Sequence, residues 1–252
     1  MTDKIEKSIF SSIINSKTII FMIAYIAIGA LFTSFQFASE NWTCLFLDII
    51  TNKIYLTIFI FPTTLLLTII SYKYIAVNYS ILIRFHNRKR FIKYQIVIAL
   101  RTISFFYMIT LIVIGIMTNI TPHYGEIISK NLNYNTYDIV ILIISIIKIY
   151  FSLSTLTLLS LVFLNKTNNE KYTIAIMFLI FIMIFLNTRI YFKNTLYYLN
   201  PNLHIYNTSG FNNVYISIIS SVVYYSLCLF FSFLLLKRIV LNMKEIGEFK
   251  SV

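Results

Sequence analysis

Apolar residues form long continuous runs along this chain and seldom alternate one by one with polar residues. Continuous runs are typical of helices that cross a membrane, because about 20 helical residues are needed to span about 30 Å of hydrocarbon. Strands of a membrane barrel would instead alternate apolar and polar positions. The pattern predicts six membrane-spanning helices, over residues 18–37, 54–76, 96–117, 139–164, 172–186 and 214–236, of which the fifth is the shortest.

The composition agrees with this pattern and excludes an ordinary soluble domain. Of the 252 residues, 58% are hydrophobic and 12% are charged, and the mean hydropathy is +0.80. Helices satisfy their own backbone hydrogen bonds in hydrocarbon. We therefore expect an all-α, polytopic membrane protein in which residues 1–252 form a single transmembrane domain. Cys44 and Cys228 are expected at different membrane depths, so no disulfide is predicted.

Lysine and arginine residues are distributed unequally between the expected loops. If both termini lie in the cytoplasm, 16 of the 21 fall on or near the cytoplasmic side, four fall on the opposite side, and Lys148 lies within a span. Short loops rich in these residues stay in the cytoplasm when a protein inserts into the membrane. The sequence therefore predicts six spans with both termini cytoplasmic.

The first 17 residues are predicted to form an amphipathic helix that lies flat in the cytoplasmic interface. Asp3 followed by Glu6 resembles an N-cap pairing that would start this helix. The apolar positions recur at helical spacing and are Ile5, Ile9, Phe10, Ile13 and Ile14. Anchoring alone is sufficient to explain such a helix, and a functional role stays open.

The densest cluster of charge is the stretch SILIRFHNRKRFIKYQ, residues 80–95, within the expected cytoplasmic segment 77–95. Ten positions hold five basic residues, Arg84, Arg88, Lys89, Arg90 and Lys93. His86 to Arg90 has the pattern of an exposed turn that leads into the third span. Two interpretations stay open. The segment is either a tether to anionic lipid, which gains about 1 kcal/mol per charge, or a surface on which a protein partner docks.

Lys148 lies within the fourth predicted span, where an unpaired charge costs roughly 3 kcal/mol. No carboxylate lies within any predicted span. Ser145, Lys148, Ser152 and Thr155 recur at helical spacing and form one polar stripe on an otherwise apolar helix. Either the stripe faces the bundle interior or a partner subunit, or Lys148 extends to the outer head groups. For Arg101, we expect extension toward the basic end of its helix.

Residues 187–213, on the expected external side, are rich in tyrosine, phenylalanine and leucine. This composition favours the head-group region over water. Because the preceding span is short, the segment is either a re-entrant or interfacial excursion or an ordinary loop that carries an aromatic belt.

The sequence contains no recognisable catalytic or metal-binding motif. His86, His123 and His204 are isolated, and neither H-E-x-x-H nor G-x-S-x-G occurs. None of the five glycines belongs to G-x-x-x-x-G-K-[ST], the motif that cradles nucleotide phosphates. We therefore expect no catalytic residue, no metal site, no cofactor and no enzymatic activity in this chain. If it takes part in ATP-driven transport, ATP and Mg are bound by another polypeptide.

In layout, the chain resembles the permease subunits of ABC-2 type transporters. The features in common are an interfacial N-terminal helix, six spans, a basic loop between spans two and three, a short fifth span with an aromatic external excursion, and a basic C-terminal tail. Ile83 to Phe91 (IRFHNRKRF) is similar to an arginine-x-x-x-arginine-lysine-x-aromatic stretch in small permeases of low-GC Gram-positive bacteria, often linked to bacteriocin or peptide export and self-immunity. Asn200 to His204 (NPNLH) resembles an asparagine-proline-leucine element before their last span.

The resemblance implies the membrane subunit of an ATP-driven exporter in the bacterial cytoplasmic membrane. The implied cargo is an amphipathic peptide, an antibiotic or a lipid-linked molecule. The implied partners are a separate ABC ATPase subunit and a second permease copy or homologue, in a homodimer or heterodimer surrounded by membrane lipid, with no nucleic acid. The implied ATPase-docking residues are Arg84, Phe85, Arg88, Lys89, Arg90 and Phe91.

For the translocation path or its outer gate, the implied residues are Lys148, Ser152, Thr155, Tyr197, Tyr198 and Pro201. The path in such transporters lies at the seam between the two halves, and the polar stripe is not required there, so the role of Lys148 stays open. A function from another class also stays open, that of a non-transporting immunity or assembly protein that binds a toxin or a signalling partner. An ion-coupled carrier is disfavoured because the spans lack acidic residues.

Overall fold

The structure is a computed structural model that describes Ser11 and residues 17–36, 42–77, 88–120, 136–186 and 214–242. Within these residues the regular structure is helical and no strand forms, which confirms the predicted all-α class. The elements are α2 (Lys17–Ser34), α3 (Trp42–Thr51), the π-helix η1 (Tyr55–Ile60), α4 (Phe61–Val77), α6 (Arg88–Ile120), α7 (Thr136–Thr167), α8 (Glu170–Leu186) and α10 (Val214–Asn242).

Five helical segments in the described part of the chain are long and apolar enough to cross a membrane. They are Lys17–Ser34, Tyr55–Ile75, Ile92–Ile120, Ile141–Thr167 and Ser220–Arg238, and each overlaps a predicted span. α8 coincides with the short fifth span, is 17 residues long as described, and is not among the five. The sixth span and the cytoplasmic position of both termini therefore stay predictions. Apart from Ser11, the expected interfacial helix lies outside the described residues.

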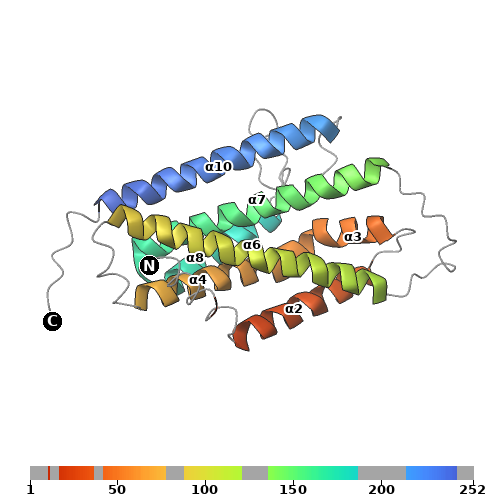
Figure 1. Ribbon diagram of the computed structural model, residues 1–252, viewed down its shortest axis with the longest axis horizontal. Coiled ribbons are helices and arrows are strands. Elements are labelled where there is room, and N and C mark those ends of the chain that lie inside the picture. The colour runs from red at the N-terminus through yellow and green to blue at the C-terminus, as the bar shows by residue number, and fades with distance from the viewer. Residues whose placement is uncertain are drawn as a thin grey trace.

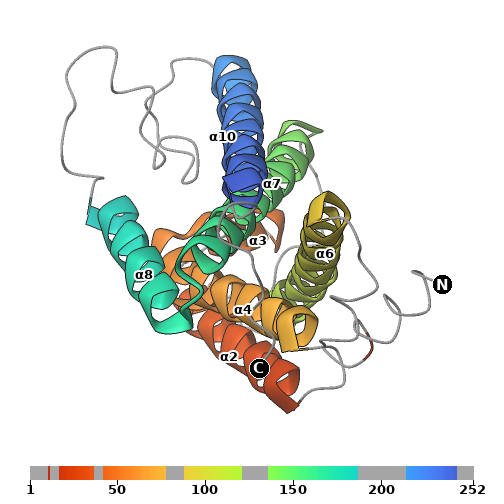
Figure 2. The same ribbon diagram turned by 90° about the vertical axis from the view of Figure 1, so that its left-hand side faces the viewer.

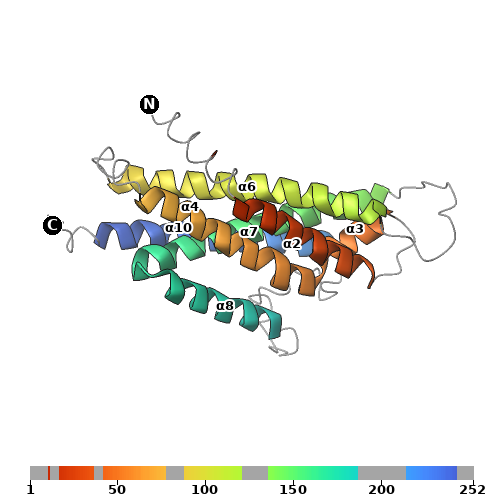
Figure 3. The ribbon, with the colours of Figure 1, turned by 90° about the horizontal axis from the view of Figure 1, so that it is seen from below.

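The helices lie side by side along the long axis of the molecule, as Figures 1 and 3 show. α7 is central and packs against α3, α4, α6, α8 and α10. Seen end-on in Figure 2, α7 lies between α10 on one side and α3 and α4 on the other. Because neighbours surround α7, both apolar and polar side chains of this helix are buried, among them Leu153, Leu161 and Thr157.

The helix α3 was not predicted from the sequence, because it lies between the first two predicted spans, 18–37 and 54–76. The chain leaves α3 at Thr51, and the side-chain oxygen of Asn52 accepts a hydrogen bond from the backbone N–H of Tyr55 at 2.9 Å. This bond is a helix cap, and η1 and α4 continue the helical path beyond it. The polar residues Thr51, Asn52 and Lys53 thus mark an interruption within a helical segment, and not the end of a loop.

A close approach between α2 and η1 holds the first two spans together. A Cβ atom on Gly29 would lie 2.5 Å from the ring of Phe59, so only glycine fits at this position. The hydroxyl of Tyr25 donates to the carbonyl oxygen of Ile58 at 3.1 Å, and the rings of Tyr25 and Phe59 lie 4.8 Å apart. The bond from Tyr25 therefore adds a polar contact to the apolar packing between α2 and η1.

Residues 88–90 do not form the exposed turn that the sequence predicts, because α6 begins at Arg88. The helix continues unbroken to Ile120 for 33 residues. Arginine and lysine are good helix formers, no proline lies in this range, and Gly115 is its one glycine. Residues 88–95 of the expected cytoplasmic segment 77–95 are therefore the first turns of a long helix.

Candidate functional site

Basic residues from four parts of the sequence meet at one end of the bundle. The C-terminal ends of α4 and α10, the N-terminal end of α6 and the α7–α8 turn lie together there, on the left in Figure 1 and facing the viewer in Figure 2. We call this the basic end. Its exposed basic side chains among the described residues are Lys73, Lys93, Lys166, Lys171, Lys237 and Arg238. The sequence assigns the same segments to the cytoplasmic side.

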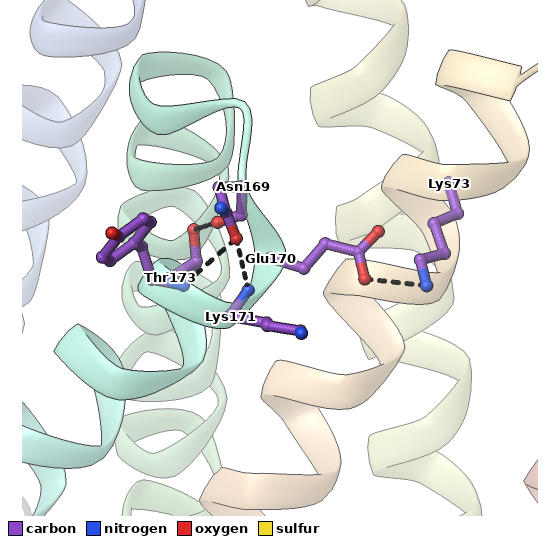
Figure 4. Close-up of polar contacts among 6 residues, drawn as sticks. Lys73, Asn169, Glu170, Lys171 and Thr173 are labelled. Carbon is purple, nitrogen blue, oxygen red and sulfur yellow. Dashed lines mark hydrogen bonds and ion pairs between the residues drawn. The ribbon is translucent and has the colours of Figure 1, made fainter.

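The turn between α7 and α8 is short and tightly hydrogen-bonded. Asn168 adopts a left-handed backbone conformation, with φ of 51°, which asparagine tolerates better than most residues. The side-chain oxygen of Asn169 accepts from the backbone N–H of Lys171 at 2.9 Å and caps α8 (Figure 4). Thr173 donates from its hydroxyl to the carbonyl oxygen of Asn169 at 3.1 Å. The two helices are thus joined by a turn of defined geometry.

This turn is attached to the end of α4 by two polar contacts. Glu170 extends toward α4, where one carboxylate oxygen lies 2.7 Å from the ammonium group of Lys73 (Figure 4). The hydroxyl of Tyr72 donates to the side-chain oxygen of Asn168 at 3.2 Å. The side chains of Lys73 and Glu170 are 53% and 36% exposed, so this ion pair contributes at most about 1 kcal/mol to stability. Its main effect is to set the position of α8 against α4.

The predicted docking residues are only partly within the described chain. Arg88, Lys89, Arg90 and Phe91 lie on the first turn of α6, and their backbone belongs to the basic end. Arg84 and Phe85 lie outside the described residues. Arg101, which is expected to extend toward the basic end of its helix, is exposed on α6.

The polar stripe of α7 faces the interior of the bundle. Lys148 is 6% exposed and Ser152 is 1% exposed, although both lie within a segment of membrane-spanning length. Ser145 is also buried, and Thr155 is half-buried and donates to the carbonyl oxygen of Phe151 at 2.9 Å. Of the two placements that the sequence left open for Lys148, the burial supports the interior one.

Two polar groups of the stripe have no polar partner in the described part of the chain. Lys148 forms neither a hydrogen bond nor an ion pair with any described residue. The hydroxyl of Ser152 is buried and has no hydrogen-bond partner there. Buried polar groups are nearly always hydrogen-bonded, and those that are not need an explanation. An ammonium group and a hydroxyl donor one helical turn apart are suited to bind an anion.

The opposite side of α7 is a paired interface with α6. The hydroxyl of Tyr107 donates to the carbonyl oxygen of Ile146 at 2.8 Å, and the hydroxyls of Ser104 and Tyr150 are hydrogen-bonded at 2.7 Å. The rings of Tyr107 and Tyr150 lie 5.9 Å apart. The sequence analysis missed this interface. Serine and tyrosine at helical spacing on α6 were a weak signal for it, but the pairing depends on the register of two helices.

The remaining predicted gate residues, Tyr197, Tyr198 and Pro201, lie outside the described residues. Among the residues that are described, no group of histidine, cysteine, aspartate or glutamate side chains could hold a metal ion. No protein-family model, curated protein or solved structure matches this chain. The resemblance to ABC-2 permeases therefore enters below only as a proposal.

Proposed function

We propose that this chain is the membrane-spanning subunit of an ATP-driven exporter whose ATPase is a separate protein. In this proposal the chain crosses the bacterial cytoplasmic membrane six times, with both termini in the cytoplasm, and pairs with a second copy or a homologue. The ATPase binds ATP and Mg and docks on the first turn of α6 and on the α7–α8 turn, both at the basic end. The cargo is amphipathic, as in a peptide, an antibiotic or a lipid-linked molecule.

The observation that carries the proposal is the position of the first turn of α6 within the basic end. Arg88, Lys89 and Arg90 begin a helix of 33 residues, which extends about 50 Å at 1.5 Å per residue. A partner that contacts this turn therefore acts on a rigid element that passes through the whole bundle. α6 also contacts α7 through the hydrogen bonds of Tyr107 and Ser104. A displacement of α6 would therefore be transmitted to α7, the central helix.

The attachment of the α7–α8 turn to α4 supports the same proposal. Tyr72 and Lys73 hold this turn at the basic end, where the partner would also contact it. Two neighbouring surfaces, one on α6 and one at the turn, would then move relative to each other when the ATPase closes. If the basic residues served only to orient the chain in the membrane, no turn of defined geometry would be needed.

The test is copurification of a companion ATPase with the affinity-tagged chain from its native host in mild detergent. We expect the ATPase to copurify with the wild type and to be reduced about tenfold or more with Arg84→Glu plus Arg88→Glu, because arginines often dominate binding at interfaces. The matched control is Lys237→Glu plus Arg238→Glu, which makes the same charge change on α10 at the same end of the bundle.

We expect this control to retain the ATPase at close to the wild-type level. Equal retention by both double variants would show that the α6 turn is not the docking site. Absence of any ATPase from the wild-type preparation, with the chain intact in the membrane, would contradict the exporter and favour the non-transporting binding protein.

A further inference from the structure

We propose that Lys148 and Ser152, with Ser145 beside them, form a site for the anionic head group of an amphipathic ligand. The inference deepens the proposed function, on which it rests for the idea that the ligand is cargo, by naming the charge of that cargo. The chemistry it assigns is a carboxylate or phosphate attached to an apolar body.

The position of Lys148 makes its charge unusual. It lies twelve residues after Thr136 and nineteen before Thr167, so both ends of α7 are about 18 Å or more away. Its side chain is 6% exposed. An ammonium group at such a depth is unstable unless it is neutralised or hydrogen-bonded. Since no described residue supplies a partner, an external anion is the natural counter-charge.

The neighbouring hydroxyl of Ser152 places a second polar group without a described partner beside the lysine. Ser152 lies one helical turn beyond Lys148, on the same face of α7, and is 1% exposed. Serine and threonine in helices commonly donate to the carbonyl four residues earlier, as Thr155 and Thr157 do here. The Ser152 hydroxyl makes no such bond, and its hydrogen is available to an acceptor.

The surroundings of the site define the rest of the ligand. Ile149, Leu153 and Leu156 are buried on the adjoining face of α7 and belong to the hydrophobic core of the bundle. A small hydrated anion would lose its water on entering and would gain only two or three donors in return. An anion with an alkyl body gains apolar burial as well, so an anionic amphiphile fits better than an inorganic ion. A cationic amphiphile would be repelled by Lys148.

The test is a binding measurement on the purified chain without any ATPase, in a nonionic detergent. The probes are dodecanoate and dodecyl phosphate, and the controls are the zwitterionic dodecylphosphocholine and the cationic dodecyltrimethylammonium ion. We expect saturable binding and a raised unfolding temperature with an anionic probe and neither effect with the controls. Preference for dodecanoate would point to a carboxylate cargo, and preference for dodecyl phosphate to a phospholipid head group.

A set of variants distinguishes the loss of the Lys148 charge from a general effect on folding. Lys148→Met should weaken binding of the anionic probe about tenfold or more, and Lys148→Arg should retain it within about threefold. Lys166→Met, the same change at an exposed lysine of α7, should bind like the wild type. If Lys148→Met does not fold, Ser152→Ala provides the measurement, with an expected loss of about threefold to tenfold.

Unchanged binding in Lys148→Met, or equal binding of the zwitterionic and anionic probes, would overturn the proposal. Either result leaves the ATPase copurification test untouched, because that test probes the basic end of the bundle and not the interior of α7. Conversely, a chain that binds no ATPase could still bind the anionic probe, so the two proposals fail separately.

Discussion

Helix α7 carries polar groups on two opposite sides. Toward α6, the carbonyl of Ile146 and the hydroxyl of Tyr150 are both hydrogen-bonded to side chains of the neighbouring helix. Lys148 and Ser152 lie two residues after Ile146 and Tyr150, and so about 200° around the helix. They are more deeply buried than Ile146 and Tyr150 but have no partner among the described residues.

Buried polar groups with a hydrogen-bond partner and those without one have different consequences in a bundle of apolar helices. Interhelical hydrogen bonds such as those of Tyr107 and Ser104 are a source of helix association when lipid surrounds the bundle. A buried group without a partner instead lowers stability, and it is best explained by something that binds there. The α6-facing hydrogen bonds at Ile146 and Tyr150 are therefore structural, and the side of Lys148 is where we place the ligand.

The largest effect is expected from Lys148→Leu, which removes the unpaired charge. The free energy of unfolding should rise by about 2 kcal/mol, because an apolar side chain at this depth has no desolvation cost. Unfolding in mixed micelles, followed by circular dichroism, measures the change. Lys166→Leu, at an exposed position, should shift the value by less than about 0.5 kcal/mol. A clear loss of stability in Lys148→Leu would mean that the lysine already has a strong partner within the protein.

A smaller effect of opposite sign is expected from Tyr107→Phe on the paired side. The variant loses the hydrogen bond to the carbonyl oxygen of Ile146 but keeps the ring, so unfolding should become easier by about 1 kcal/mol. The same denaturation measurement applies. Tyr172→Phe, on the exposed part of α8, is the matched control and should have no measurable effect. Equal stability of the two variants would show that the α6–α7 bond does not hold the helices together.

The smallest effects are expected from a serine-to-alanine substitution, made once at the α6–α7 interface and once on the Lys148 side of α7. This pair also gives the sharpest comparison. Ser104→Ala should lower stability by about 1 kcal/mol or less, because it leaves the Tyr150 hydroxyl without its partner. Ser152→Ala should leave stability unchanged within about 0.5 kcal/mol, because its hydroxyl has no bond to lose. Parallel unfolding curves measured without added ligand give this difference. Equal losses at Ser104 and Ser152 would remove the distinction between the two sides.

Much of the helical layout could be predicted from the sequence. The spans overlap the observed helices because hydrophobic length is a local property that the order of residues alone specifies. The stripe of Ser145, Lys148 and Ser152 was also predictable, since it depends only on helical periodicity. The prediction of a turn at residues 88–90 was wrong, because α6 begins at Arg88. A dense run of charge resembles a loop in sequence, but arginine and lysine also favour a helix.

Other features could not be predicted, because they depend on partners that are distant in the sequence. α3 was missed, since the polar residues around Asn52 look like the end of a loop until the cap to Tyr55 is seen. The fit of Gly29 against Phe59 joins residues thirty positions apart, and the contact of Lys73 with Glu170 joins residues almost a hundred apart. No local pattern specifies which of many similar residues will meet.

The sequence by itself determined that this chain is helical and apolar, which segments have the length of a membrane span, and that four polar residues share one face of a helix. These properties follow from backbone hydrogen bonding and from the cost of polar groups in hydrocarbon, both of which act locally. Only the tertiary structure decided that Tyr150 is paired, that Lys148 is buried, and that Ser152 lacks a donor or acceptor in the described chain. The physical reason is that a hydrogen bond between helices requires a particular neighbour at a particular register, and that choice is made by the packing of the whole bundle.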